Sequence, residues 1–217
     1  MADPLFKITV FKPEVGAGTL INDAFETIVK KTILDRFGKV VSKSKNDKVK
    51  AGFSIDFAAL GSEEARKLST AIPASSFRVH LISPKHADVE AALALKKKVA
   101  PSFPDAAFRT EIPKGSGLGG RAESGENFAF VQLAPFTGDA VMLENNEKAL
   151  AAREVAELAC HELGHAMGIS KNQGRGMMQG DESTSVDVDA PPPEKYFEEA
   201  DAKIILATLE SIAAAAK

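Results

Sequence analysis

"EVAELACHELGHAMG", residues 154–168, is the stretch that decides both the fold and the chemistry expected of this chain. An apolar residue recurs at every fourth position: Val155, Ala159, Leu163 and Met167. This period predicts a partly buried helix that runs from about Glu147 to Gly168, with Asn146 as its cap. The rest of the domain is expected to pack around this long helix.

Three chemically active side chains lie on the same helix. His161 and His165 are four positions apart, so both imidazoles lie on one side of the helix, one turn apart, and can bind one metal ion. Glu162 follows His161 and is near enough to hold a water at that ion and accept its proton. This spacing predicts a zinc site with Glu162 as general base, suited to hydrolysis of peptide or amide bonds. The alternative is a core helix whose histidines are satisfied by hydrogen bonds without metal.

With Gly168, these residues resemble the metzincins, zinc peptidases with the pattern H-E-x-x-H-x-x-G-x-x-H and a methionine turn downstream. "GRGMMQG" (174–180) looks like that Met-turn, with Met178, or else Met177, beneath the metal. The resemblance implies zinc bound by His161 and His165 and catalysis by Glu162. It also implies a peptide or protein substrate that pairs in extended form with a sheet edge.

The chain departs from the metzincin pattern at the third histidine. Lys171 stands there, and its ammonium group repels a metal cation. Because one branch, the snapalysins, has an aspartate at this position, the resemblance allows an oxygen ligand instead. The main candidates are Asp181, Glu182 and Asn172, followed by Gln173, Asp187 and Asp189. There are two alternatives for the remaining zinc ligand. It could be Glu198 or Glu199, as in a gluzincin-like site, or it could be water.

We expect an α+β, zincin-like fold with a mixed, mostly parallel, twisted sheet. Strands are predicted at 5–11, 49–57, 77–83, 106–112, 128–134 and 139–145, and helices at 19–38, 62–72, 87–99, 147–168 and from Pro193 onward. One domain would span 1–217, with an N-terminal subdomain, 1–168, that includes the active-site helix. A small C-terminal subdomain, 169–217, would hold the Met-turn and the last helix.

Two short segments are expected to be turns or loops. "SKND" (44–47) is predicted to form a hairpin turn, and 114–127 a glycine-rich loop. "GSGLGG" (115–120) satisfies G-x-G-x-x-G, but it leads toward another strand rather than directly into a helix. We therefore expect a loop bordering the cleft and not a dinucleotide site.

The remaining reactive residues are expected to be structural. Cys160 and Tyr196 should pack, the latter on the last helix, while His80 should lie in a strand and His86 in a surface loop. A single cysteine excludes an internal disulfide bond.

Composition and charge restrict the class of protein. The chain has 217 residues and a net charge of −3, with no basic stretch interleaved with aromatic residues, so we expect no nucleic-acid partner. No signal peptide or membrane-spanning apolar run is found, which makes a cytoplasmic protein without membrane association the simplest expectation. A chain from which an export signal had been removed would look the same.

Three functions follow from the sequence. The first is a zinc-dependent metalloendopeptidase, and the second is a zinc-binding or interaction protein that keeps a degenerate metzincin-like fold without turnover. The second is suggested by Lys171, whereas retention of Glu162, which metal binding alone does not need, favours the enzyme. The third is an α/β domain with no metal.

Overall fold

The fold is given by a computed structural model. It describes residues 3–13, 21–59, 73–82, 120–122, 127–133, 145–170, 176–178 and 194–216. The predicted elements at 62–72, 87–99 and 106–112 lie outside these residues, as do nearly all of the predicted strand at 139–145, Lys171 and His86.

The described strands form one mixed sheet with the order β2-β1-β3-β5-β4. Its strands are β1 (Phe6–Lys12), β2 (Phe53–Ala59), β3 (Ser76–Ile82), β4 (Gly120–Ala122) and β5 (Phe128–Gln132). All neighbouring strands are parallel except β4, which pairs antiparallel to β5 at one edge. The expectation of a mixed, mostly parallel sheet combined with helices is therefore confirmed.

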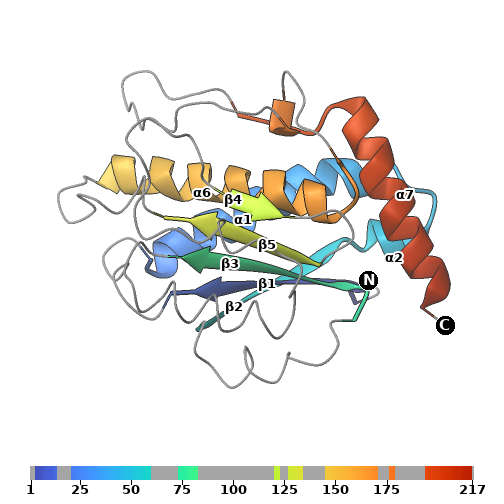
Figure 1. The fold of residues 1–217 in the computed structure, drawn as a ribbon, viewed down its shortest axis with the longest axis horizontal. Coiled ribbons are helices and arrows are strands. Elements are labelled where there is room, and N and C mark those ends of the chain that lie inside the picture. Colours follow the sequence, from blue (N-terminus) through green and yellow to red (C-terminus); the bar gives the residue numbers. More distant parts are fainter. Residues whose placement is uncertain are drawn as a thin grey trace.

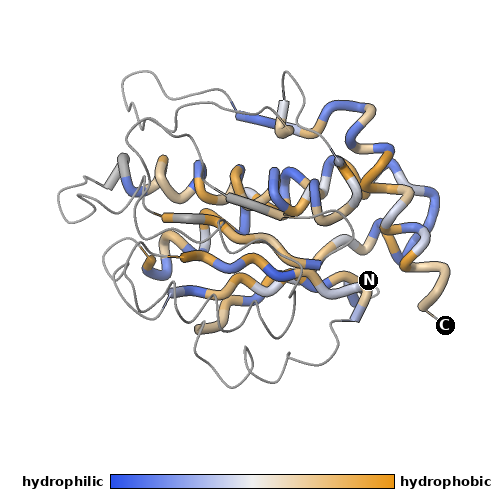
Figure 2. Tube along the Cα trace, viewed as in Figure 1, coloured by the Kyte–Doolittle hydropathy of each residue, from blue (hydrophilic) through white to orange (hydrophobic). Residues whose placement is uncertain are grey.

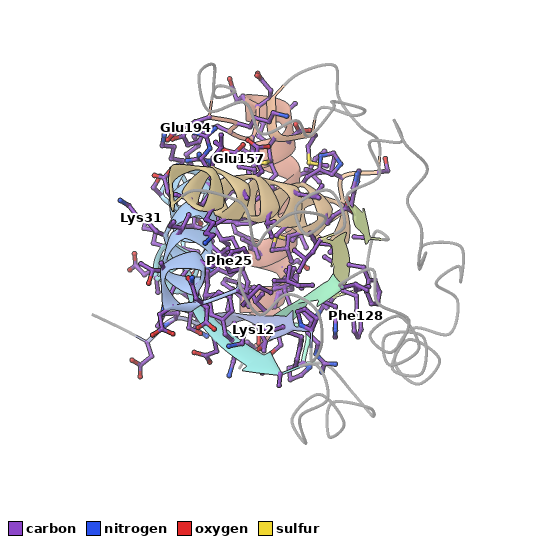
Figure 3. The ribbon with its side chains drawn as sticks, turned by 90° about the vertical axis from the view of Figure 1, so that its left-hand side faces the viewer. Lys12, Phe25, Lys31, Phe128, Glu157 and Glu194 are labelled. Carbon is purple, nitrogen blue, oxygen red and sulfur yellow. The ribbon has the colours of Figure 1, made fainter. Side chains whose placement is uncertain are left out.

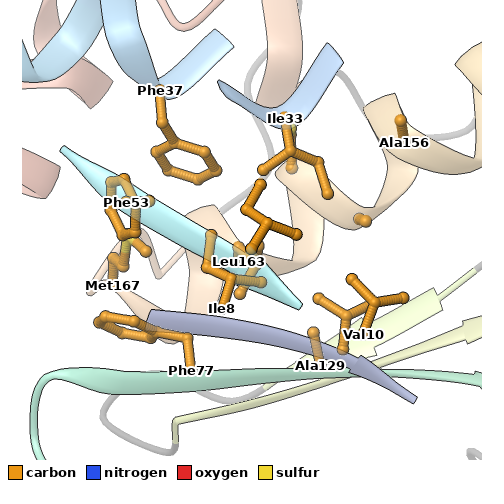
Figure 4. Packing of buried hydrophobic residues seen from close by; sticks show 14 of the residues in the cluster. Ile8, Val10, Ile33, Phe37, Phe53, Phe77, Ala129, Ala156, Leu163 and Met167 are labelled. Atoms are coloured by element: carbon orange, nitrogen blue, oxygen red, sulfur yellow. The ribbon is translucent and has the colours of Figure 1, made fainter. Parts of the chain in front are cut away.

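One face of the sheet carries the core shared with two long helices. These are α1 (Asp23–Val41) and α6 (Asn145–Ala166), which contact each other above the sheet (Figure 1). In β3 every second side chain points into this core: Phe77, Val79 and Leu81. Figure 4 shows Ile33 and Phe37 from α1 facing Ile8 and Val10 across the core, with Leu163 entering from α6.

The same alternation places a second set of side chains on the opposite face. Arg78 and His80 of β3 lie there with Phe11, Phe128 and Phe130, and all of them are at most 2% exposed. Figure 3 shows Phe128 on the side of the sheet away from the helices. The strands β3 and β5 are therefore buried on both faces, as expected inside a parallel sheet, whereas Lys7 of β1 and Asp56 of β2 are exposed; Figure 2 shows β5 as largely apolar.

The C-terminal part packs on the end of α6. It contains the single-turn 3₁₀ helix η2 (Gly176–Met178), an extended segment at 194–198 and α7 (Glu199–Ala215). The side chain of Thr208 donates a hydrogen bond of 2.8 Å to the carbonyl of Met167, which fixes α7 at the point where α6 ends. Among the described residues, no helix is both long and apolar enough to cross a membrane.

Several local predictions were wrong, each for a structural reason. Residues 44–47 do not form a hairpin turn, because Asn46 caps the short helix α2 (Asp47–Lys50) and β1 and β2 are parallel. Within the predicted loop 114–127, residues 120–122 form the edge strand β4. The last helix begins at Glu199 rather than Pro193, because 194–198 is extended and bonds to neighbouring elements.

Candidate metal centre

The helix that carries the motif ends in a well-defined glycine cap. Gly168 has a φ of 107°, and its N–H donates to the carbonyl of His165 at 2.9 Å. The next N–H, of Ile169, reaches back to the carbonyl of Gly164 at 3.1 Å. This pair of hydrogen bonds is the Schellman motif, which needs a residue in the left-handed region. The chain therefore turns sharply at Gly168, and the turn brings the carbonyl of Ile169 next to His165.

His161 and His165 are brought together with their Nε2 atoms facing each other. The two Nε2 atoms are 3.2 Å apart, and the rings are nearly perpendicular, with an interplanar angle of 78°. Both side chains are half-buried at the C-terminal end of α6. The structure therefore places the two predicted ligands on one side of the helix at the spacing that the sequence implied.

A backbone carbonyl orients each imidazole from the opposite side. Nδ1 of His161 lies 2.9 Å from the carbonyl oxygen of Met177, and Nδ1 of His165 lies 2.6 Å from that of Ile169. A carbonyl can only accept, so each Nδ1 carries a hydrogen, and in the neutral form of each ring the Nε2 lone pair faces the other ring. A direct hydrogen bond between the two Nε2 atoms would need a further proton.

This arrangement fits a zinc ion. Two nitrogens bound at about 2.0–2.1 Å with a tetrahedral angle stand about 3.3–3.4 Å apart, close to the observed 3.2 Å. Donation of the other ring N–H to a backbone carbonyl is the usual support of a metal-binding histidine. The donor chemistry and the orientation of His161 and His165 both suit the metal.

The predicted Met-turn packs directly against the helix at this point. Met177 and Met178 form η2, and both side chains are at most 2% exposed. A Cβ placed on Gly164 would lie 2.7 Å from Sδ of Met178 and 3.0 Å from Cε1 of Phe197. A larger residue at 164 would have to displace the buried side chain of Met178 and that of Phe197, so Met178 packs on the helix at Gly164 while the Met177 backbone supports His161.

The described residues do not supply a third ligand. Within the described ranges, His161 and His165 are not joined by another His, Cys, Asp or Glu in a group that could hold a metal ion. This includes Glu198 and Glu199, the latter paired with Lys203 at 2.8 Å. The other candidates, Asp181, Glu182 and Asn172, lie outside the described residues.

Glu162 and Cys160 flank His161 on the helix but differ in chemistry. The side chain of Glu162 is 5% exposed, so its carboxylate is held away from bulk water. Cys160 is fully buried in the core, and burial raises the pKa of its thiol well above its ordinary value. A neutral, buried thiol is a packing residue, so the prediction for Cys160 is confirmed.

Sequence reasoning missed the cluster that connects α1 and α6 to the segment before α7. Arg36 is 3% exposed and pairs through Nη2 with the buried carboxylate of Glu157 at 2.8 Å. Nη1 bonds to the hydroxyl of Tyr196 at 3.0 Å and lies 3.5 Å from a carboxylate oxygen of Glu194. Figure 3 shows Glu157 and Glu194 close together. Tyr196 thus precedes the last helix and bonds to α1, contrary to the expectation that it packs on that helix.

Burial and pairing oppose each other at this cluster. Burial alone would lower the pKa of Arg36, but the hydrogen bond and charge of Glu157 raise it above its ordinary value. Arg36 therefore stays charged inside the fold. The separation of more than a hundred residues between the partners explains why no local pattern revealed them.

No protein-family model matches the chain, and no curated protein matches it in sequence.

Proposed function

We propose that this protein is a zinc-dependent metallopeptidase with a metzincin-like, zincin-type catalytic domain. The observation that carries the proposal is the pair of Nε2 atoms 3.2 Å apart, each on a ring whose Nδ1 is bonded to a backbone carbonyl. His161 and His165 would hold the ion. The mixed sheet, the long motif helix and the methionine turn against it are consistent with the resemblance.

Zinc bound between these histidines would lower the pKa of a water toward about 7 and polarise the carbonyl of a peptide bond. Glu162 would accept the proton from the attacking water and pass it to the leaving amine. His161 and His165 are fixed by Met177 and Ile169, so their ring orientation needs no adjustment on binding. The edge strand β4, next to α6, would offer backbone groups to a substrate in extended form.

The proposal is tested first by metal analysis of the purified protein. We expect about one zinc per chain in the wild type and its loss in His165→Ala, because one remaining imidazole binds the ion far more weakly. Glu162→Gln should keep the zinc but lower hydrolysis of a peptide library at least about a hundredfold, since general-base catalysis contributes on that order. Absence of zinc from a folded wild type would overturn the proposal.

The second candidate is a zinc-binding protein without turnover. It is favoured by Lys171, which replaces the third histidine of the metzincin pattern. Stoichiometric zinc in the wild type, together with no cleavage of any peptide in a broad library, would establish it. Cleavage that disappears in Glu162→Gln would eliminate it.

A further inference from the structure

The buried Arg36 holds the extended segment 194–198 against both long helices. Besides its bond to Glu157, its guanidinium carbon lies 4.3 Å from the centre of the Tyr196 ring, and Nη1 bonds to the Tyr196 hydroxyl. That hydroxyl donates to Glu194 at 2.7 Å, and Glu157 also accepts from the backbone N–H of Lys195 at 3.3 Å. Several bonds of the segment therefore converge on this one ion pair.

The backbone of the same segment holds η2. The carbonyl of Tyr196 accepts from the N–H of Met177 at 2.8 Å. A Cβ on Gly176, whose φ is 70°, would lie 2.9 Å from that carbonyl oxygen, so the two backbones approach as closely as a glycine allows. The position of the Met177 peptide is thus set by where Tyr196 lies.

Met177 in turn orients His161. Its carbonyl oxygen is 2.9 Å from Nδ1 of His161 and selects the tautomer in which Nε2 is free of hydrogen. A continuous path of hydrogen bonds therefore leads from Arg36 through Tyr196 and Met177 to His161. The path joins α1, which packs against α6, to the imidazole of His161, which faces His165.

We infer that Arg36 and Tyr196 are positioning residues that fix the orientation and tautomer of His161 through the Met177 peptide. The inference rests on the proposed function only in so far as His161 is a zinc ligand. If the Tyr196 hydroxyl loses its partners, the segment 194–198 can shift, the Met177 carbonyl moves with it, and Nδ1 of His161 loses its acceptor. The lone pair of Nε2 is then no longer directed at the position shared with His165.

The test uses two variants of the full chain. Tyr196→Phe keeps the ring over Arg36 but removes the hydroxyl, and Arg36→Lys keeps a positive charge beside Glu157 but removes the planar fork that also reaches Tyr196. The matched control is Ser44→Ala, which removes a bond to Glu210 of α7 that lies outside this path. Circular dichroism and urea unfolding show that each variant is folded.

Two measurements are made on each protein. Long-range ¹H–¹⁵N correlation of the imidazoles in the metal-free protein reports which nitrogen of His161 carries the hydrogen. Competition with a chelator gives the affinity for Zn²⁺. We expect His161 to be in the Nδ1–H tautomer in the wild type and in Ser44→Ala, and to populate both tautomers in Tyr196→Phe and Arg36→Lys. Zn²⁺ binding should weaken about tenfold in these two variants and stay within about twofold in the control.

The outcomes separate this inference from the proposed function. An unchanged His161 tautomer together with unchanged zinc affinity in both variants overturns the positioning role and leaves the zinc site intact. A tautomer change in a protein that binds no zinc even as wild type supports the positioning role and overturns the metallopeptidase. Equal losses in Ser44→Ala would also overturn the inference, because they would reflect general loosening of the C-terminal part.

Discussion

Gly38 and Gly164 show how much the surroundings decide the role of a glycine. Both lie inside long helices, Gly38 in α1 and Gly164 in α6. A Cβ at position 38 would meet no atom within 4 Å, whereas at position 164 it would meet Met178, Phe197 and Ile169. Gly38 therefore only lowers the stability of its helix, whereas Gly164 leaves room for the side chains of Met178 and Phe197 against α6.

The same substitution should have opposite effects at these positions. Gly38→Ala should raise the free energy of unfolding by about 0.5–1 kcal/mol, because alanine restricts the unfolded chain and favours the helix. Gly164→Ala should lower it by about 1 kcal/mol or more, since the new methyl group overlaps the packed side chains of Met178 and Phe197. Urea denaturation of the two variants beside the wild type measures both changes. Stabilisation by Gly164→Ala would contradict the packing described for Met178.

At the scale of elements, the joint between α1 and α6 depends on one buried ion pair. Arg36 and Glu157 are 3% and 4% exposed, so neither charge is solvated by bulk water. Such a pair adds little net stability over apolar residues, but loss of one partner leaves the other charge buried without compensation. The exposed pair Lys7–Asp56, at the same distance of 2.8 Å, carries no such penalty.

Neutralising one acid in each pair compares the two environments directly. Glu157→Gln should lower the free energy of unfolding by about 3 kcal/mol, because the positive charge of Arg36 stays buried and is only partly balanced by Asp35 and Glu194. Asp56→Asn should change it by less than about 1 kcal/mol. Chemical denaturation at low and moderate salt measures both. If both substitutions changed the free energy of unfolding by the same small amount, the prediction would be contradicted, because water would then have to solvate the charge of Arg36.

Elements were predictable from sequence where a local pattern determined them. Strands β1, β3 and β5, the helices α1 and α6, and the pairing of His161 with His165 all follow from apolar period or spacing. The prediction that α1 stops at Gly38 was wrong, because the buried residues Val40 and Val41 extend its apolar side past the glycine.

Other features depend on partners distant in sequence and could not be read from it. The extended segment 194–198 looked like the start of a helix, but its backbone bonds to Met177 and Glu157 instead. The acceptors of the two histidines are backbone carbonyls, which any residue type supplies. The GMM pattern predicted a methionine beneath the site, but no side-chain pattern could have shown that the backbone carbonyls of Met177 and Ile169 are the acceptors.

Considered as a whole, the molecule hides a titratable group on the face of the sheet opposite α1 and α6. His80 is fully buried, with its ring stacked 4.7 Å from Phe11 and 5.2 Å from Phe130. Within the part of the chain that the structure describes, neither ring nitrogen has a hydrogen-bond partner. Burial, aided by the charge of Arg78, lowers the pKa of His80 to about 3.

This burial should make the fold sensitive to mild acid. Because the pKa of His80 is lower in the folded chain than the ordinary value of 6.5, the unfolded chain binds more protons between these values. The stability that depends on a neutral His80 is complete above about pH 6.5 and is lost as the pH falls toward 3. At pH 5 the loss amounts to about 2 kcal/mol of unfolding free energy. His80→Phe should remove this part of the pH dependence.

Urea denaturation at pH 8 and pH 5, in the presence of a chelator, measures the effect. The quantity compared is the difference in unfolding free energy between the two pH values, so any change in packing that is common to both cancels. An equal difference in the wild type and His80→Phe would contradict this prediction, because it would show that His80 is already protonated at pH 5 in the folded protein.

The strand order has a consequence for how the chain is made. β1 leaves the ribosome first, yet it lies between β2 and β3, so its two ladders cannot both form until residue 82 has been synthesised. β5 is added later still, and the helix with both histidines follows it. At about 5–20 residues per second, the nascent sheet waits for several seconds with an incomplete edge. During synthesis, α6 with both histidines is therefore added to strands that have already been made, and α7 supplies the last residues of the core.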